Sequence, residues 1–207
     1  MGDQLQRAVE VMDRLRSPGG CPWDAAQTHE SLARYLVEET YETLEAIETN
    51  DIALLREELG DILLQVLFHA RLAEELPAGE RFTIEDVAGD LVNKLIRRHP
   101  HVFAGGQVSD AAEVNENWER RKVTEKGRNS VVDGVPTGQP ALALAAKLAS
   151  RAARAGLNVA PEGTDIGRRL FAVVRDAVAA GIDPETALRE TARAYRDALL
   201  AAETGMR

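Results

Sequence analysis

Apolar residues recur at helical spacing along most of this chain, and no stretch alternates apolar and polar residues for long enough to suggest a sheet. The first predicted helix runs from about Leu5 to Leu15 and is ended by Pro18 and the two glycines after it. Further helices are predicted at residues 28–49, 52–75, 83–99, 141–155, 164–180 and 184–202. The chain is therefore expected to be all-α, with a helical bundle as its core.

The helices at 28–49 and 52–75 are expected to form a hairpin, because only Asn50 and Asp51 separate them. Thr28 is the expected N-cap of the first helix. Its inner face is expected to carry Leu32, Leu36, Thr40, Leu44 and Ile47. On the second helix, apolar residues cover about two thirds of the circumference, which is more than one neighbour requires. We therefore expect the second helix to be packed on several sides, within a dimer.

The composition excludes several classes of protein. The 34 acidic and 25 basic residues give a net charge of −9, which argues against nucleic-acid binding. The first residues lack the pattern of a signal peptide, and no apolar run approaches the roughly 20 residues that span a bilayer. Cys21 is the only cysteine, so no intramolecular disulfide can form. We expect a cytoplasmic protein with neither nucleic-acid nor membrane partners.

Two pairs of acidic residues match across the predicted hairpin. Glu39 and Glu42 are three positions apart, so both project from one face of their helix. The same holds for Glu58 and Asp61 on the second helix. Glu42 and Glu58 each lie eight positions from Asn50, whereas Glu39 and Asp61 each lie eleven positions from it. An antiparallel hairpin therefore places the pairs opposite each other, at roughly 12 and 16 Å from the turn.

An acidic helix face is most often only a solvated surface, and each pair alone fits that interpretation. The second helix argues against it, because no lysine or arginine occurs from residue 57 to 70 and its polar stripe consists of Glu58, Asp61, Gln65 and His69. Clustered, partly buried carboxylates cannot all stay ionised without compensation, which a bound cation supplies. Oxygen ligands favour Mg²⁺, and Mn²⁺ should substitute for it. A di-iron site would need glutamate and histidine three positions apart, which neither helix offers.

Several segments resemble those of a known family. The acidic residues of the hairpin resemble the signature of the all-α nucleoside triphosphate pyrophosphohydrolase superfamily, with Glu38, Glu39, Glu42, Glu58 and Asp61 in its positions. More specifically, the chain resembles the MazG family in CPWDAAQTH, EELGDILLQVLFHA, KLIRRHPHVF, NENWERRKVTEK and VDGVPTGQPAL. These motifs occur in order between residues 21 and 142.

The resemblance implies hydrolysis of (d)NTPs to (d)NMP and pyrophosphate, as nucleotide-pool housekeeping, and a helical bundle completed by a homodimer. It implies that Mg²⁺ is ligated by Glu39, Glu42, Glu58 and Asp61. Glu38 is then the remaining acid beside these ligands, and it is the candidate for orienting or deprotonating the attacking water. Phosphoryl transfer mainly needs charge neutralisation and a positioned water, so this chemistry fits the carboxylate cluster.

Lys94, Arg97 and Arg98 form a cationic face on the helix at 83–99, which suits substrate phosphates. The alternative is a solvated basic helix end. Trp118 and Lys122 are one helical turn apart, and they are candidates for stacking on the base and for a further phosphate contact. Taken alone, Trp118 would more often anchor a core or an interface.

The domain organisation is expected to be a MazG-like catalytic domain at 1–126, a linker at 127–140 and a shortened second repeat at 141–207. In the second repeat, TDIGRRLFAVV aligns with EELGDILLQVL of the first, but Arg168 takes the place of Asp61. The second copy cannot assemble the metal site from its own residues, so activity is expected in the first copy. If the ancestral active copy was the second, catalysis here would be weakened or lost.

Two rival functions stay open at this point. A non-catalytic helical interaction module would explain the acidic face, and a dUTP- or dCTP-specific pyrophosphatase would share the chemistry. The sequence does not define the base or sugar preference, the phosphorus attacked or the number of metal ions.

Overall fold

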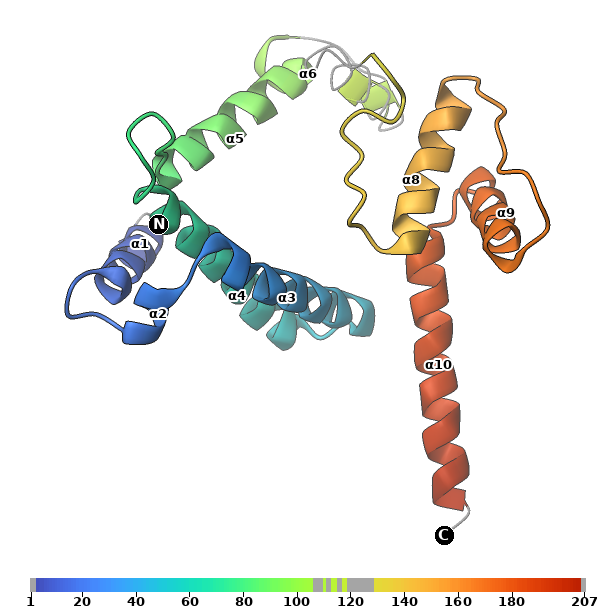
Figure 1. Cartoon of the computed structure of the whole chain (residues 1–207), viewed down its shortest axis with the longest axis horizontal. Coiled ribbons are helices and arrows are strands. Elements are labelled where there is room, and N and C mark those ends of the chain that lie inside the picture. Colours follow the sequence, from blue (N-terminus) through green and yellow to red (C-terminus); the bar gives the residue numbers. More distant parts are fainter. Residues whose placement is uncertain (1–2, 106–109, 111–112, 115–116, 119–128, 206–207) are drawn as a thin grey trace. The chain divides into compact units, whose positions relative to one another are not determined.

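The computed structural model describes residues 3–105, 110, 113–114, 117–118 and 129–205. Throughout these described residues the regular structure is helical, without a strand, which confirms the all-α prediction. The helices are α1 (Asp3–Arg16), α2 (Pro22–Ala26), α3 (His29–Thr49), α4 (Ile52–Ala73), α5 (Ile84–Arg98), α6 (Pro100–Phe103), α8 (Ala141–Arg154), α9 (Ile166–Ala179) and α10 (Pro184–Gly205) (Figure 1). They form two compact units, residues 1–109 and 110–207.

The α3–α4 hairpin begins and turns where the sequence predicts. Thr28 caps α3: its hydroxyl accepts a hydrogen bond from the Ser31 backbone N–H (3.2 Å), and its own N–H donates to the Ser31 hydroxyl (2.9 Å). Asn50 ends α3 in the left-handed conformation, with φ 56°. Asp51 then caps α4 by accepting from the N–H groups of Ala53 and Leu54. These local contacts fix the length of both helices and hence the residues that face each other.

The core of the first unit lies against the C-terminal half of α4. Its buried members come from α1, α3 and α4 and are Met12, Leu32, Leu67, Phe68 and Leu72. Arg16 of α1 donates two hydrogen bonds of 2.9 Å to the Glu75 carboxylate just after α4. Arg71 donates to Asp13 at 2.8 Å. α1 is thereby held to the end of α4 that lies away from the turn.

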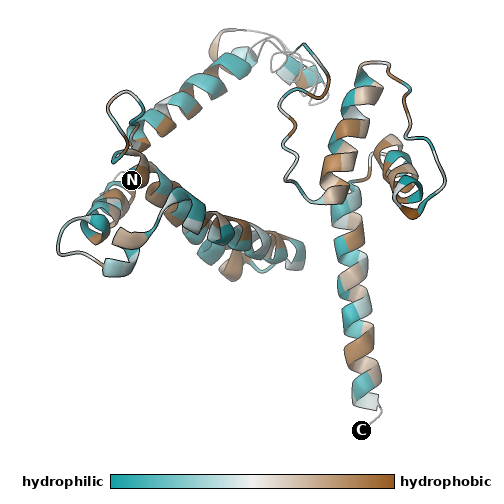
Figure 2. Cartoon of the chain, in the orientation of Figure 1, coloured by the Kyte–Doolittle hydropathy of each residue, from teal (hydrophilic) through white to brown (hydrophobic). Residues whose placement is uncertain are grey.

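The other half of the hairpin is less covered than the sequence predicts. Leu32 is buried, but Leu36, Thr40 and Ile47, which were expected on the inner face of α3, are exposed, Ile47 by 52%. On α4, Leu59 is 53% exposed, and Leu64 and Val66 are exposed as well. Figure 2 shows apolar stretches along both helices. The prediction for Leu36, Thr40 and Ile47 is wrong for the single chain, because two helices alone cannot cover faces this wide.

In the second unit, α8 packs on α9, and α10 contacts both. Val174 of α9 is buried, with 2% of its surface exposed. Arg151 of α8 holds the preceding segment through hydrogen bonds to the carbonyls of Val131 (3.0 Å) and Asp133 (2.8 Å). None of the helices in the described part of the chain is both long enough and apolar enough to cross a membrane.

Candidate metal centre

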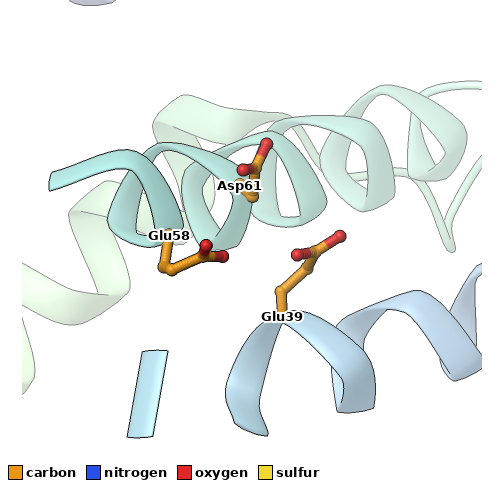
Figure 3. A group of neighbouring side chains, drawn as sticks. All are labelled: Glu39, Glu58 and Asp61. Atoms are coloured by element: carbon orange, nitrogen blue, oxygen red, sulfur yellow. The ribbon is translucent and has the colours of Figure 1, made fainter. Parts of the chain in front are cut away.

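Three carboxylates from two helices converge in the α3–α4 hairpin. Glu39 on α3 and the pair Glu58 and Asp61 on α4 each offer an oxygen atom, and these atoms all lie within 4.8 Å of one another. Figure 3 shows the three side chains extending into the space between the helices. Glu58 is buried, with 6% of its surface exposed, and the other two are half-buried. The group includes three of the four residues expected to bind a metal ion.

Burial and, after it, the charges of neighbouring acids disfavour the ionised forms of two carboxyl groups in this cluster. Burial raises the pKa of Glu39, and the neighbouring charge of Asp61 raises it further. Burial likewise raises the pKa of Glu58, followed by the charges of Glu42 and Asp61. Within the part of the chain that is described, Glu58 Oε2 is buried without a hydrogen-bond partner. A cation between the helices would relieve both the repulsion and the unsatisfied oxygen.

Glu42 borders this group. Its side chain is exposed, and it is not one of the three carboxylates whose oxygens lie within 4.8 Å of one another. Its charge nevertheless raises the pKa of both Glu58 and Glu39, so it faces the same space. Asp61 is the leading charge acting on Glu39, and Glu42 is the leading charge acting on Glu58. This is the cross-helix pairing that the symmetry about Asn50 predicts.

The chemistry of the group fits a hard divalent cation. All its donors are carboxylate oxygens, the ligands that Mg²⁺ and Mn²⁺ take in proteins. Among the described residues no lysine or arginine forms an ion pair with Glu39, Glu58 or Asp61. The charge of the group is therefore left for a ligand to balance.

The structure does not bring the other predicted site residues into this group. Glu38 is exposed on α3 and precedes Glu39, so its side chain leaves the helix about 100° away. Lys94 and Arg97 are exposed on α5, whereas Arg98 is buried, with 8% of its surface exposed. Figure 1 shows α5 running away from the α3–α4 pair, so its C-terminal end lies apart from the carboxylates.

Of the remaining two predicted substrate contacts, one lies in the second unit. Trp118 is half-buried there, and Lys122 lies outside the described residues.

Sequence reasoning assigned no role to Gln65, His69 or His29. Gln65 is buried, with 4% of its surface exposed, and follows Asp61 on α4 by one turn. His69 follows by one further turn, and its Nδ1 lies 2.7 Å from Nδ1 of His29 at the start of α3. Gln65 and His69 could have been singled out from the sequence, because they belong to the polar stripe of α4. Nothing in the sequence indicates that His29, 40 positions earlier, meets His69.

The fold and the site define the class of protein, an all-α unit built around a helical hairpin lined by carboxylates. The family model of the MazG nucleotide pyrophosphohydrolase domain matches residues 27–103, which include the whole hairpin. The chain is 39% identical, over 94% of its length, to the nucleoside triphosphate pyrophosphohydrolase/pyrophosphatase MazG of Thermotoga maritima, and covers 83% of that protein. The chain belongs to the MazG nucleotide pyrophosphohydrolase family.

Other known proteins are also similar to this chain. A nucleoside triphosphate pyrophosphohydrolase of Mycobacterium tuberculosis is 47% identical over 98% of this chain, which spans 59% of that protein. An uncharacterized 26.1 kDa protein of Streptomyces cacaoi is 57% identical over 98% of the chain, which spans 84% of it. The crystal structure of a mazG-related protein from Thermotoga maritima is 32% identical and aligns with a TM-score of 0.46, covering 56% of this chain and 97% of that one.

Proposed function

We propose that this chain hydrolyses nucleoside triphosphates, ribo or deoxyribo, to the monophosphate and pyrophosphate in a Mg²⁺-dependent reaction, as nucleotide-pool housekeeping. The observation that carries the proposal is the convergence of Glu39, Glu58 and Asp61. Relatives named nucleoside triphosphate pyrophosphohydrolases support the reaction.

In this proposal Mg²⁺, or Mn²⁺ in its place, is held by Glu39, Glu58 and Asp61, with Glu42 as the fourth ligand. The raised pKa values of Glu39 and Glu58 support the assignment, because burial and then neighbouring acids disfavour the charged carboxylates, which a cation would stabilise. The ion supplies charge neutralisation on the phosphate oxygens. Glu38 is assigned to the attacking water, since it is the acid next to a ligand on α3.

The proposed substrate contacts are the residues whose chemistry matches a nucleotide. Lysine and arginine side chains suit phosphate oxygens, and the indole ring of tryptophan suits stacking on a base. These contacts are Lys94, Arg97, Arg98, Trp118 and Lys122. A cytoplasmic location belongs to the same proposal, supported by the substrate class and by a single cysteine.

A homodimer is also part of the proposal. Exposed apolar residues lie on both helices of the hairpin, and such a surface is covered in most proteins. Leu36, Leu59 and Leu64 are examples, each more than a third exposed. A second copy packed there would complete the bundle that the sequence predicts for α4.

The domain organisation stays a proposal in the form that the sequence predicts: a catalytic domain at 1–126, a linker at 127–140 and a degenerate repeat at 141–207. Three helices occupy the last region, and α9 begins with Asp165 as its N-cap. Arg168 stands on α9 at the position equivalent to Asp61, so the repeat lacks a matching carboxylate pair.

The test is a panel of canonical and modified triphosphates, with and without Mg²⁺, with products identified by mass. Monophosphate and pyrophosphate are expected only with the metal. Inorganic phosphate and a diphosphate would overturn the reaction class. Turnover of dUTP or dCTP alone would favour the single-nucleotide alternative, and absence of both turnover and Mg²⁺ binding would favour the non-catalytic interaction module.

A further inference from the structure

A row of buried polar groups extends from the carboxylate cluster along one face of α4. Glu58, Gln65 and His69 lie on this face at positions i, i+7 and i+11. The atoms Glu58 Oε2, Gln65 Oε1 and His69 Nε2 are each buried and form no hydrogen bond with any part of the chain that the structure describes. A bound metal ion would explain the buried, unpaired oxygen of Glu58, but it does not explain the buried, unpaired atoms of Gln65 and His69.

Gln65 is the informative member of the row. Only 4% of its surface is exposed, and an unpaired carbonyl oxygen in such a place destabilises the fold relative to an apolar side chain of the same size. A packing role would be filled better by leucine or methionine. The amide is therefore expected to have a partner in a liganded state.

The row extends in one direction only. Toward the C-terminal end of α4 it continues from Asp61 to Gln65 and His69, at intervals of about 6 Å along the helix axis. Toward the turn, the positions one helical turn before Glu58 are Leu54 and Leu55, both half-buried and apolar. On α4, a polar ligand held at the cluster thus finds further hydrogen-bonding groups on the Gln65 side and not on the side of the turn.

His29 contacts His69, the last member of the row. The His29 and His69 rings are nearly parallel, at 6°, with centroids 5.0 Å apart and the two Nδ1 atoms 2.7 Å apart. Such a contact needs one donor and one acceptor, so at most one of the two Nδ1 atoms carries a proton. Burial, and then the nearby His29, lower the pKa of His69, which keeps its ring neutral at neutral pH. His69 is thereby held as a neutral, oriented group one helical turn after Gln65 on α4.

We propose that Gln65 is a substrate-binding residue that hydrogen-bonds a sugar hydroxyl of the nucleotide. This inference rests on the proposed function. With the phosphates at Glu39, Glu58 and Asp61, the sugar is the part of a nucleotide that follows the phosphate chain, and Gln65 is the next polar group along α4.

The test compares Gln65→Leu with the wild type in steady-state kinetics. Loss of one neutral hydrogen bond made in both the bound and transition states should raise KM roughly 3- to 15-fold and leave kcat nearly unchanged. Inorganic tripolyphosphate, which lacks a nucleoside, should inhibit both proteins equally. Gln6→Leu, an exposed substitution of the same chemistry on α1, is the matched control and should leave KM unchanged.

The sugar is identified by substrates that lack one hydroxyl. Wild-type protein should lose affinity when the 2′ or the 3′ hydroxyl is removed, and Gln65→Leu should no longer distinguish that pair of substrates. If both proteins discriminate equally, the assignment to the sugar is overturned. Weaker inhibition by tripolyphosphate in Gln65→Leu would also overturn it, because Gln65 would then act through the cluster.

The melting temperatures of Gln65 variants distinguish a substrate-binding role of this residue from a structural one. Gln65→Leu, and Gln65→Met as a second, unbranched variant, should melt at or above the wild-type temperature without substrate, because each removes an unpaired buried amide. A lower melting temperature with unchanged KM would assign Gln65 a structural role and overturn the proposal. A wild type that hydrolyses no nucleotide contradicts the proposed function itself, whereas an active wild type with equal KM in the variants contradicts only this inference.

Discussion

An oxygen of Glu39 on α3 lies within 4.8 Å of an oxygen of Glu58 on α4, although 19 positions separate the two residues in the sequence. Burial, and after it the charges of neighbouring acids, raise the pKa of both carboxyl groups. Among these charges, that of Asp61 has the largest effect on Glu39, and that of Glu42 has the largest effect on Glu58. The ligand-free hairpin therefore disfavours the ionised forms of both carboxyl groups. A divalent cation is the simplest group that would stabilise this arrangement.

Removing one carboxylate should abolish turnover and preserve the fold. Glu58→Gln and Asp61→Asn keep the size of each side chain but remove a charged oxygen ligand, so kcat/KM should fall roughly 1000-fold or more. Pyrophosphate release measures the effect, and circular dichroism checks the helices. Glu45→Gln, an exposed change on α3 outside the group, is the control and should retain activity. Unchanged turnover in Glu58→Gln would refute the site.

Magnesium should stabilise the protein more at high pH than at low pH. In the folded protein the pKa of Glu58 is raised above 4.5. The stability that the protonated Glu58 contributes is therefore fully present below the pKa of the unfolded chain, and it is lost as the pH rises through the pKa of the folded protein. The ligand-free protein therefore becomes less stable as the cluster ionises, and Mg²⁺ then binds more tightly. At a hundredfold excess over Kd, the melting temperature should rise by about 5 to 10 °C.

Thermal unfolding with and without MgCl₂, from acidic to mildly alkaline buffers, measures this dependence. Glu58→Gln provides the control, since it should melt at least as high as the wild type without the metal and gain nothing from adding it. An equal effect of Mg²⁺ at every pH would contradict the assignment of the ligands.

Much of the hairpin could be predicted because its signals are local. Thr28, Asn50 and Asp51 cap and turn the chain through contacts within a few residues, and the symmetry of the acids about Asn50 then fixes which side chains face each other. The exposure of Leu36 and Ile47 could not be predicted, since periodicity tells which residues share a face but not what covers that face.

Contacts that depend on tertiary packing were harder to predict from the sequence. The His29–His69 pair joins positions 40 apart and follows from the angle at which the start of α3 meets α4. The basic residues of α5 could be recognised in the sequence, but their separation from the cluster depends on the direction in which α5 leaves α4.

The His29–His69 contact should make the fold less stable in mildly acidic buffer. Burial, and then His29, lower the pKa of His69 below 6.5. The stability that the neutral ring contributes is therefore present above 6.5 and is lost as the pH falls through the folded pKa. A second proton would also place two N–H donors against each other. Urea unfolding between about pH 5 and 8 measures the slope, which His69→Phe should reduce.

The exposed apolar residues of the hairpin should hold a second copy of the chain. Leu59 is 53% exposed on α4, so Leu59→Glu would change the stability of a monomer little, whereas in a dimer it would bury an unpaired charge. Light scattering should report a dimer for the wild type and a dimer constant weakened at least about 100-fold for Leu59→Glu. Ile182→Glu, at a residue 52% exposed in the second unit, is the matched control and should remain dimeric. A wild-type monomer at high concentration, or a Leu59→Glu variant that dimerises as well as the wild type, would show that this face of α4 is not the interface.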